Sequence, residues 1–352
     1  MRIDIGGDSQ DEILESLREV QEDAVTDLYA HDVAFEERIL RATIDLLHRV
    51  ASRDRRVASM TFSNCSGPYE LIILEALALK LVSEIEVNRC TMIESSGDMI
   101  LPYAIFPALR WGIQYRHLEK LCIQDLTLPT RELAEFLTIG LVGSNHLKEL
   151  SLTNSDFTED EDENRVISAL VAGLRRNTSL EALVLGALGQ GFDDTEAGGV
   201  VNALELHPSL KRLAIFSLDC GIQTTQAFTK LLLKNRKLTD LELNNCHFSP
   251  TCIDSFTKSL RGHPCLARLA LNGDDLTDEE LNLGSLVEIL STCPKLKRLD
   301  LGSNKFSSAG LEMLAVHNQF FRNYQSFVGE TFRERPSFVY PCAMFRSEIC
   351  GL

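Results

Sequence analysis

The sequence predicts an α/β solenoid, a right-handed horseshoe of stacked units with parallel strands on its concave face and helices on its convex face. Three observations support this prediction. An apolar template recurs about nine times, its copies share one phase, and helical patterns fill the intervals between them. The copies start at residues 57, 82, 118, 147, 180, 210, 238, 266 and 296, so the intervals are 25 to 36 residues long.

The template has apolar residues at positions 1, 4, 6 and 11 and a small polar or thiol residue at position 9. The clearest copy contains Leu238, Leu241, Leu243, Cys246 and Phe248. Positions 4 and 6 have the two-residue period of a short strand, so both side chains point inward. The side chain at position 9 can form a hydrogen bond with the backbone where the chain leaves the strand.

Helical patterns follow the template copies. Residues 164–176 place Val166, Ile167, Leu170 and Leu174 on one face, and residues 224–235, 250–261 and 277–293 repeat the arrangement. One strand–helix unit cannot bury its apolar face alone. Stacked neighbours make a continuous core, which is why the fold prediction needs the whole array.

Phrases such as NTSLEALVLG, HPSLKRLAIF, NRKLTDLELNNC and CPKLKRLDLGSNKF resemble the ribonuclease-inhibitor-type leucine-rich-repeat family. The resemblance covers about residues 57 to 318. It implies a horseshoe that binds proteins on its concave face. The repeats here are irregular in length, and cysteines and aromatic residues are sparser than in the ribonuclease inhibitor itself, so ribonuclease is not the expected target.

The ends lie outside the template. We expect residues 1–55 to form an acidic helical N-terminal cap, with a docking helix as the alternative. Residues 56–318 would form the repeat domain. Residues 319–352 are rich in aromatic residues and would form a C-terminal cap or a docking arm.

Two insertions interrupt the array. Residues 155–164 (SDFTEDEDEN) predict a solvated acidic loop, because the spacing and glycine of an EF-hand are missing. Residues 99–111 are apolar, and we expect Pro102 and Pro107 to break a helix there. This second segment would pack under the horseshoe, or form a contact site if it is exposed.

Composition limits the function. The formal net charge is −16, which argues against nucleic acid and favours a basic or mixed-charge protein surface as partner. With no apolar signal core and no long apolar run, we expect a monomeric protein of the cytoplasm or nucleus without membrane contact. The ten cysteines are expected to be reduced core thiols. We expect no metal and no cofactor, since HExxH, a CxxC pair and a Walker loop are all missing from the sequence.

The repeat phase also predicts a binding surface, because positions 3, 5 and 7 point out of the concave sheet. An apolar centre surrounded by arginine and acidic residues is typical of a protein-binding site. As an alternative, Phe216 lies flat on the sheet and the charges pair with each other across strands. The candidate residues are Val184, Arg212, Ala214, Phe216, Asp240, Glu242, Asn244, Arg268, Asn272, Arg298 and Asp300.

The sequence therefore predicts a non-enzymatic scaffold or regulator that binds one protein partner of unidentified nature on its concave face. Two alternatives remain open. One is a GTPase-activating protein of the Ran-regulator type, and the other is a stand-alone relative of an innate-immune-type sensor. Both rest on fold-level analogy.

Overall fold

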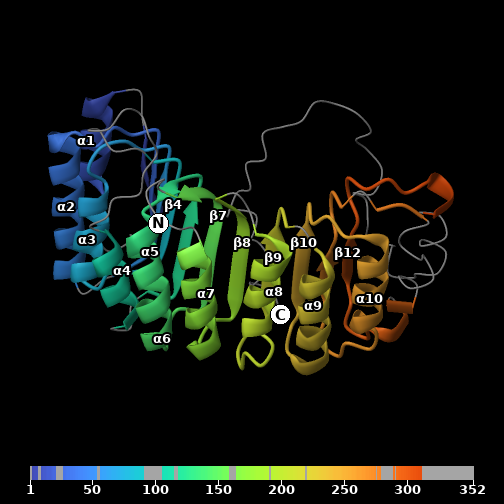
Figure 1. Cartoon of the computed structure of the whole chain (residues 1–352). Coiled ribbons are helices and arrows are strands. Elements are labelled where there is room, and N and C mark those ends of the chain that lie inside the picture. Colours follow the sequence, from blue (N-terminus) through green and yellow to red (C-terminus); the bar gives the residue numbers. More distant parts are fainter. Residues whose placement is uncertain are drawn as a thin grey trace.

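The computed structural model describes residues 2–6, 9–20, 27–53, 56–90, 105–114, 118–157, 164–189, 192–218, 220–274, 276–278, 288–289 and 291–310. The predicted C-terminal segment 319–352 and most of the acidic loop therefore lie outside the described residues. The chain forms a single parallel sheet with its helices stacked beside it as a second layer (Figure 1). This is the predicted α/β solenoid.

The strands follow one another across the sheet in chain order, β1-β2-β3-β4-β5-β7-β8-β9-β10-β11-β12, with the short strand β6 beside β7. Their bounds are β1 Arg2–Ile5, β2 Asp27–His31, β3 Val57–Ser63, β4 Val82–Asn88, β5 Lys120–Gln124, β6 Thr127–Leu128, β7 Glu149–Phe157, β8 Ala182–Leu188, β9 Arg212–Phe216, β10 Asp240–Asn244, β11 Arg268–Ala270 and β12 Arg298–Asp300.

The helices connect consecutive strands and cover the convex face. Their bounds are α1 Gln10–Glu19, α2 Glu37–Ser52, α3 Glu70–Ala78, α4 Ile105–Gln114, α5 Thr130–Glu135, the π-helix η2 Phe136–Gly140, α6 Leu141–Gly143, α7 Asn164–Arg176, α8 Asp194–Ala203, α9 Ile222–Lys234 and α10 Pro250–Leu260. The predicted helix at 164–176 is confirmed residue for residue, and those at 224–235 and 250–261 to within two residues.

The register confirms the phase of the template. Leu213 lies opposite Leu241, and Leu241 lies opposite Leu269, so position 4 faces position 4 in each pair of strands. These leucines are fully buried and belong to one continuous core that runs through the stack. Burial of such side chains is worth roughly 1.5–3 kcal/mol each, so the stacked units stabilise one another.

The N-terminal region corrects one expectation. Residues 1–55 do not lack repeats, because β1 and β2 pair in parallel and extend the sheet beyond β3. Ile3, Ile5 and Leu28 occupy the inward positions of these strands and are buried. The predicted helical pattern is present as well, with Ile39, Leu46 and Leu47 of α2 buried against the same core.

A second correction concerns the insertion at 99–111. Pro107 does not break a helix but lies in the first turn of α4. A proline is tolerated there because the missing N–H would have had no partner within the helix. Within α4, the side chains of Ile105, Phe106 and Leu109 are buried, while Trp111 is 36% exposed.

One backbone feature recurs in the ten units from β2 to β12. The residue at position 8, near the end of the strand or just beyond it, has φ between +45° and +71° in ten consecutive units, in the left-handed region that most residues avoid. In seven of them its N–H donates to the carbonyl of position 7 in the next unit, over 2.7–3.3 Å. The backbone thus turns at the same position in each of these units. These residues are Asp32, Asn64, Arg89, Asp125, Asn154, Ala187, Ser217, Asn245, Gly273 and Ser303.

The ninth position behaves as predicted. The thiols of Cys65, Cys90 and Cys246 donate to the carbonyls of Ser63, Asn88 and Asn244, two residues earlier in the chain. The amide of Asn304 donates to three backbone carbonyls, at 2.6 Å to Leu271, 3.0 Å to Leu301 and 3.4 Å to Gly302. All eight cysteines within the described residues are free thiols, as expected from the composition.

Position 8 gives a first prediction. Ala187→Val should destabilise the protein by about 1–2 kcal/mol, because a β-branched side chain is strained at positive φ. Ala187→Gly should leave stability unchanged or raise it by up to about 1 kcal/mol. Urea unfolding midpoints test both changes. The control is Ala182→Val on the same strand, where the backbone is extended; an equal loss at both alanines would contradict the account.

His207 gives a second prediction. Its side chain is 6% exposed, and burial lowers its pKa to about 4. Stability from this histidine is therefore present above pH 6.5, the pKa of the unfolded state, and is lost as the pH falls towards 4, by about 3 kcal/mol in all. His207→Asn, which places here the residue found at the equivalent positions 177 and 235, should remove this loss.

Unfolding of both proteins at pH 7.5 and pH 4.5 measures the difference. Burial also lowers the pKa of His263, so the variant should retain part of the pH dependence. If the two proteins lose equal stability on acidification, His207 is not buried as a neutral imidazole.

Candidate protein-binding surface

The concave face presents the side chains at positions 3, 5 and 7 of each unit. The register aligns Arg212, Asp240, Arg268 and Arg298 in one row across β9 to β12. Ala214, Glu242 and Asp300 lie in the next row. All eleven candidate residues therefore come from neighbouring strands or the turns directly after them, as the phase predicted.

The centre of this surface is an apolar cluster of Val184, Ala214 and Phe216, separate from the main core. Phe216 packs against Gly186 of β8: a methyl group at Gly186 would come within 2.8 Å of the Phe216 Cβ. Val184 and Phe216 are each only 8% exposed. The aromatic ring therefore lies against the sheet, as in the alternative interpretation, and does not project as an isolated anchor.

Beside this cluster, one carboxylate bridges two guanidinium groups. Glu242 accepts from Arg212 at 3.3 Å and from Arg268 at 2.7 Å, although its side chain is only 5% exposed. A carboxylate at this depth requires compensation, since removing a partner of a buried charge typically costs 3–5 kcal/mol. The charges pair across strands, and the bridge gives this part of the surface a fixed geometry.

Amide side chains continue the surface along position 7. The Oδ1 atom of Asn244 accepts from the Nδ2 group of Asn272 at 3.0 Å and from its backbone N–H at 3.1 Å. Asn272 in turn accepts from the backbone N–H of Gly302 at 2.7 Å. Each amide thus links one unit to the next. The remaining candidates lie in the other two rows: Asp240 accepts from the Thr239 hydroxyl, Asp300 accepts from the backbone N–H of Gly302, and Arg298 is exposed.

The N-terminal half of the concave face carries a second feature, which the sequence interpretation missed. Asp4, Asp27, Glu84 and Glu86 lie on β1, β2 and β4, and each occupies position 3 or 5 of its unit. This half is therefore acidic. Recognising β1 and β2 as strands would have revealed Asp4 and Asp27, through the alternation in the segments RIDI and DLYAH.

The candidate residues on this face form ion pairs, amide hydrogen bonds and a small apolar cluster. Within the described residues, no group of three or more His, Cys, Asp or Glu side chains is arranged to hold a metal ion. No helix in the described part of the chain is long and apolar enough to cross a membrane. Ion pairs, amides and a small apolar cluster are the means by which proteins recognise other proteins.

The comparisons with known proteins agree with this architecture. A family model described as "Leucine Rich repeat" matches residues 292–315. Among solved structures, the crystal structure of the Rad7 and Elc1 complex in yeast is similar, with a TM-score of 0.55 and 16% sequence identity over 87% of this chain and 70% of that chain. At this identity the likeness concerns the fold.

A second solved structure, leiomodin-1 actin-binding site 2, has a TM-score of 0.30 and 18% identity over 53% of this chain and 84% of that chain. A TM-score this low bears on neither fold nor function. No curated protein matches the sequence.

The single parallel sheet, the convex helices and the recurring left-handed turn define an α/β solenoid. With the repeat match at residues 292–315 and the Rad7–Elc1 likeness, this fold is a leucine-rich-repeat solenoid.

The Glu242 bridge gives a third prediction. Arg212→Ala or Arg268→Ala alone should cost about 1 kcal/mol, since one guanidinium remains to compensate the carboxylate. The double variant should cost about 3–5 kcal/mol, because a buried carboxylate is then left alone. Chemical denaturation of the two single variants and the double variant measures this coupling. Adding Glu242→Gln to the double variant should restore part of the loss, whereas small additive losses would show that Glu242 is not held by the two arginines.

Proposed function

We propose that this chain is a non-catalytic scaffold or regulator whose concave sheet face binds one protein partner. The observation that carries the proposal is the combination found on β8 to β12. A small apolar cluster of Val184, Ala214 and Phe216 borders the fixed bridge at Glu242. Because these charged groups are already ordered beside an apolar centre, this surface loses less side-chain entropy when it binds a partner.

The charge on the concave face indicates the partner's chemistry. Asp4, Asp27, Glu84 and Glu86 make the N-terminal half acidic, while the C-terminal half alternates arginines with carboxylates. The whole chain carries a net charge of −16. A partner with a basic or mixed-charge surface would be attracted to this face and oriented by it.

The similar solved structure supports the proposal at the level of architecture. Rad7 was crystallised in complex with Elc1, so an array of comparable fold takes part in a protein complex. That support is fold-level analogy, and the identity of the partner comes from experiment. The two other functions, a GTPase-activating protein of the Ran-regulator type and a stand-alone relative of an innate-immune-type sensor, remain hypotheses that rest on the sequence.

A pull-down from a lysate of the native source tests the proposal. The baits are the wild type, a concave variant with Glu84→Lys and Arg298→Glu, and a convex variant with Glu15→Lys and Arg131→Glu. Both variants make the same net change in charge, and all four positions lie outside the Glu242 bridge. Circular dichroism first establishes that all three baits are folded.

We expect the wild type and the convex variant to capture the same protein, and the concave variant to capture at least about fivefold less of it. Equal capture by all three baits, or loss only from the convex variant, would contradict binding on the concave face. A wild-type eluate that holds no specific protein would also count against the proposal.

A further inference from the structure

The edge of the solenoid where helices end and strands begin has a charge opposite to that of the chain. Five equivalent stretches along this edge, residues 175–181, 205–211, 233–239, 261–267 and 291–297, each end before the concave position 3 and together contain nine Lys or Arg residues and only two Asp or Glu residues. The chain as a whole carries −16. We call these stretches the basic rim.

Helix dipoles account for only part of this rim. Cations are favoured in the last turn of a helix, which explains Arg175 and Arg176 on α7 and Lys234 on α9. The dipole acts within that last turn, so it does not account for Lys297, at the entry to β12, nor for Arg236 and Lys237, which follow the end of α9. The additional charge therefore calls for another explanation.

Two leucines lie exposed within the same rim. Leu206 is 75% exposed just after α8, and Leu233 is 61% exposed near the end of α9. The Glu205 carboxylate pairs with the Lys234 ammonium group, which holds these two helix ends together. We take these two exposed aliphatic side chains, on helix ends joined by an ion pair and set among cations, as candidate contact residues.

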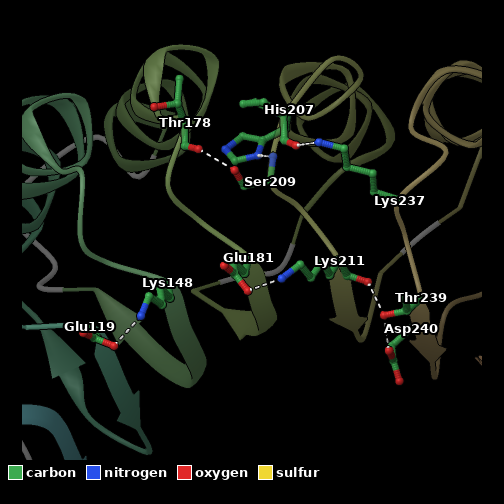
Figure 2. Close-up of polar contacts among 11 residues, drawn as sticks. Glu119, Lys148, Thr178, Glu181, His207, Ser209, Lys211, Lys237, Thr239 and Asp240 are labelled. Carbon is green, nitrogen blue, oxygen red and sulfur yellow. Dashed lines mark hydrogen bonds and ion pairs between the residues drawn. The ribbon is translucent and has the colours of Figure 1, made fainter. Parts of the chain in front are cut away.

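Two rim cations bind backbone carbonyls and have no carboxylate partner among the described residues. Lys237 donates to the carbonyl of Pro208 at 2.7 Å, and Arg236 donates to the carbonyl of Gly262 at 3.0 Å. These bonds position the cations and leave their charge uncompensated by the carbonyl partner. Figure 2 shows Lys237 beside His207, in the layer of helix ends above the strands.

Other cations of this edge alternate with glutamates. Lys148 binds Glu119 at 2.7 Å, and Lys211 binds Glu181 at 2.7 Å, along the start of the strands (Figure 2). The edge is therefore a mixed surface with a positive excess. A phosphate backbone would meet these carboxylates, and the exposed apolar groups are aliphatic, whereas unpaired bases are held by aromatic rings.

We propose that the basic rim around Leu206 and Leu233 docks an acidic protein segment carrying aliphatic side chains. The leucines receive the apolar side chains, and Arg236, Lys237 and the arginines at the end of α7 pair with carboxylates of the segment. The residues Leu206, Leu233, Arg236 and Lys237 precede the concave positions of their units, so they provide a second docking site that does not depend on the first.

Fluorescence anisotropy with a defined probe tests the proposal. The probe is a short fluorescein-labelled peptide of glutamates with two leucines four positions apart, and the matched peptide has serines in place of the leucines. We expect the wild type to bind the leucine peptide in a salt-sensitive manner and the serine peptide at least about fivefold more weakly.

Variants locate the site. Leu206→Ser with Leu233→Ser should weaken binding at least about fivefold, and Arg236→Glu with Lys237→Glu at least about tenfold. The apolar control is Ile222→Ser, a residue 67% exposed at the opposite end of α9. The charge control is Arg131→Glu, which is exposed on α5. Both controls should change binding by less than about twofold.

Three results would overturn the proposal: no binding at low salt, equal affinity for both peptides, or equal effects of rim and control variants. Tighter binding of single-stranded DNA of matched charge, lost in the Arg236 and Lys237 variant, would assign the rim to nucleic acid instead. The variant Glu84→Lys with Arg298→Glu should bind the peptide like the wild type, which separates this test from that of the concave face.

Discussion

The left-handed residue after each strand is the constraint on which the rest of this structure depends. Its N–H reaches the position 7 carbonyl of the next unit, from Asp32 and Ser63 near one end to Gly273 and Gly302 near the other. A strand shifted by one residue would lose this bond and turn its leucines out of the core. The turn therefore fixes the register, and the register places equivalent side chains in rows along the concave face and the basic rim.

Most of the fold could be predicted from the sequence, because the leucines at positions 4 and 6 identify each strand directly. Two features could not. In β2, Ala30 replaces the inward leucine of position 6 and Val33 replaces the polar residue of position 9, so the template was not recognisable. Position 8 has no shared side chain: Arg89 and Ala187 adopt the same backbone as Asn64, because the turn is imposed by the stack.

The sequence predicted where the candidate residues lie, but not how deeply they are buried or which side chains they contact. The repeat phase placed Glu242 and Phe216 on the concave face, where they lie. Their burial depends on neighbours one strand away: the guanidinium groups of Arg212 and Arg268 enclose the carboxylate, and Gly186 leaves room for the ring. A pattern along one strand carries no information about packing across strands. The exposed leucines of the rim were missed because they lie outside the template.

Carboxyl footprinting of the protein in complex with its captured partner tests the concave-face account most directly. A carbodiimide with a small amine labels exposed carboxylates, and mass spectrometry compares the free and bound protein. The account predicts that labelling of Glu84 and Asp300 on the concave strands falls on binding, while labelling of Asp45 and Glu132 on α2 and α5 is unchanged. Protection of Asp45 and Glu132 with unchanged labelling of Glu84 and Asp300 would contradict it.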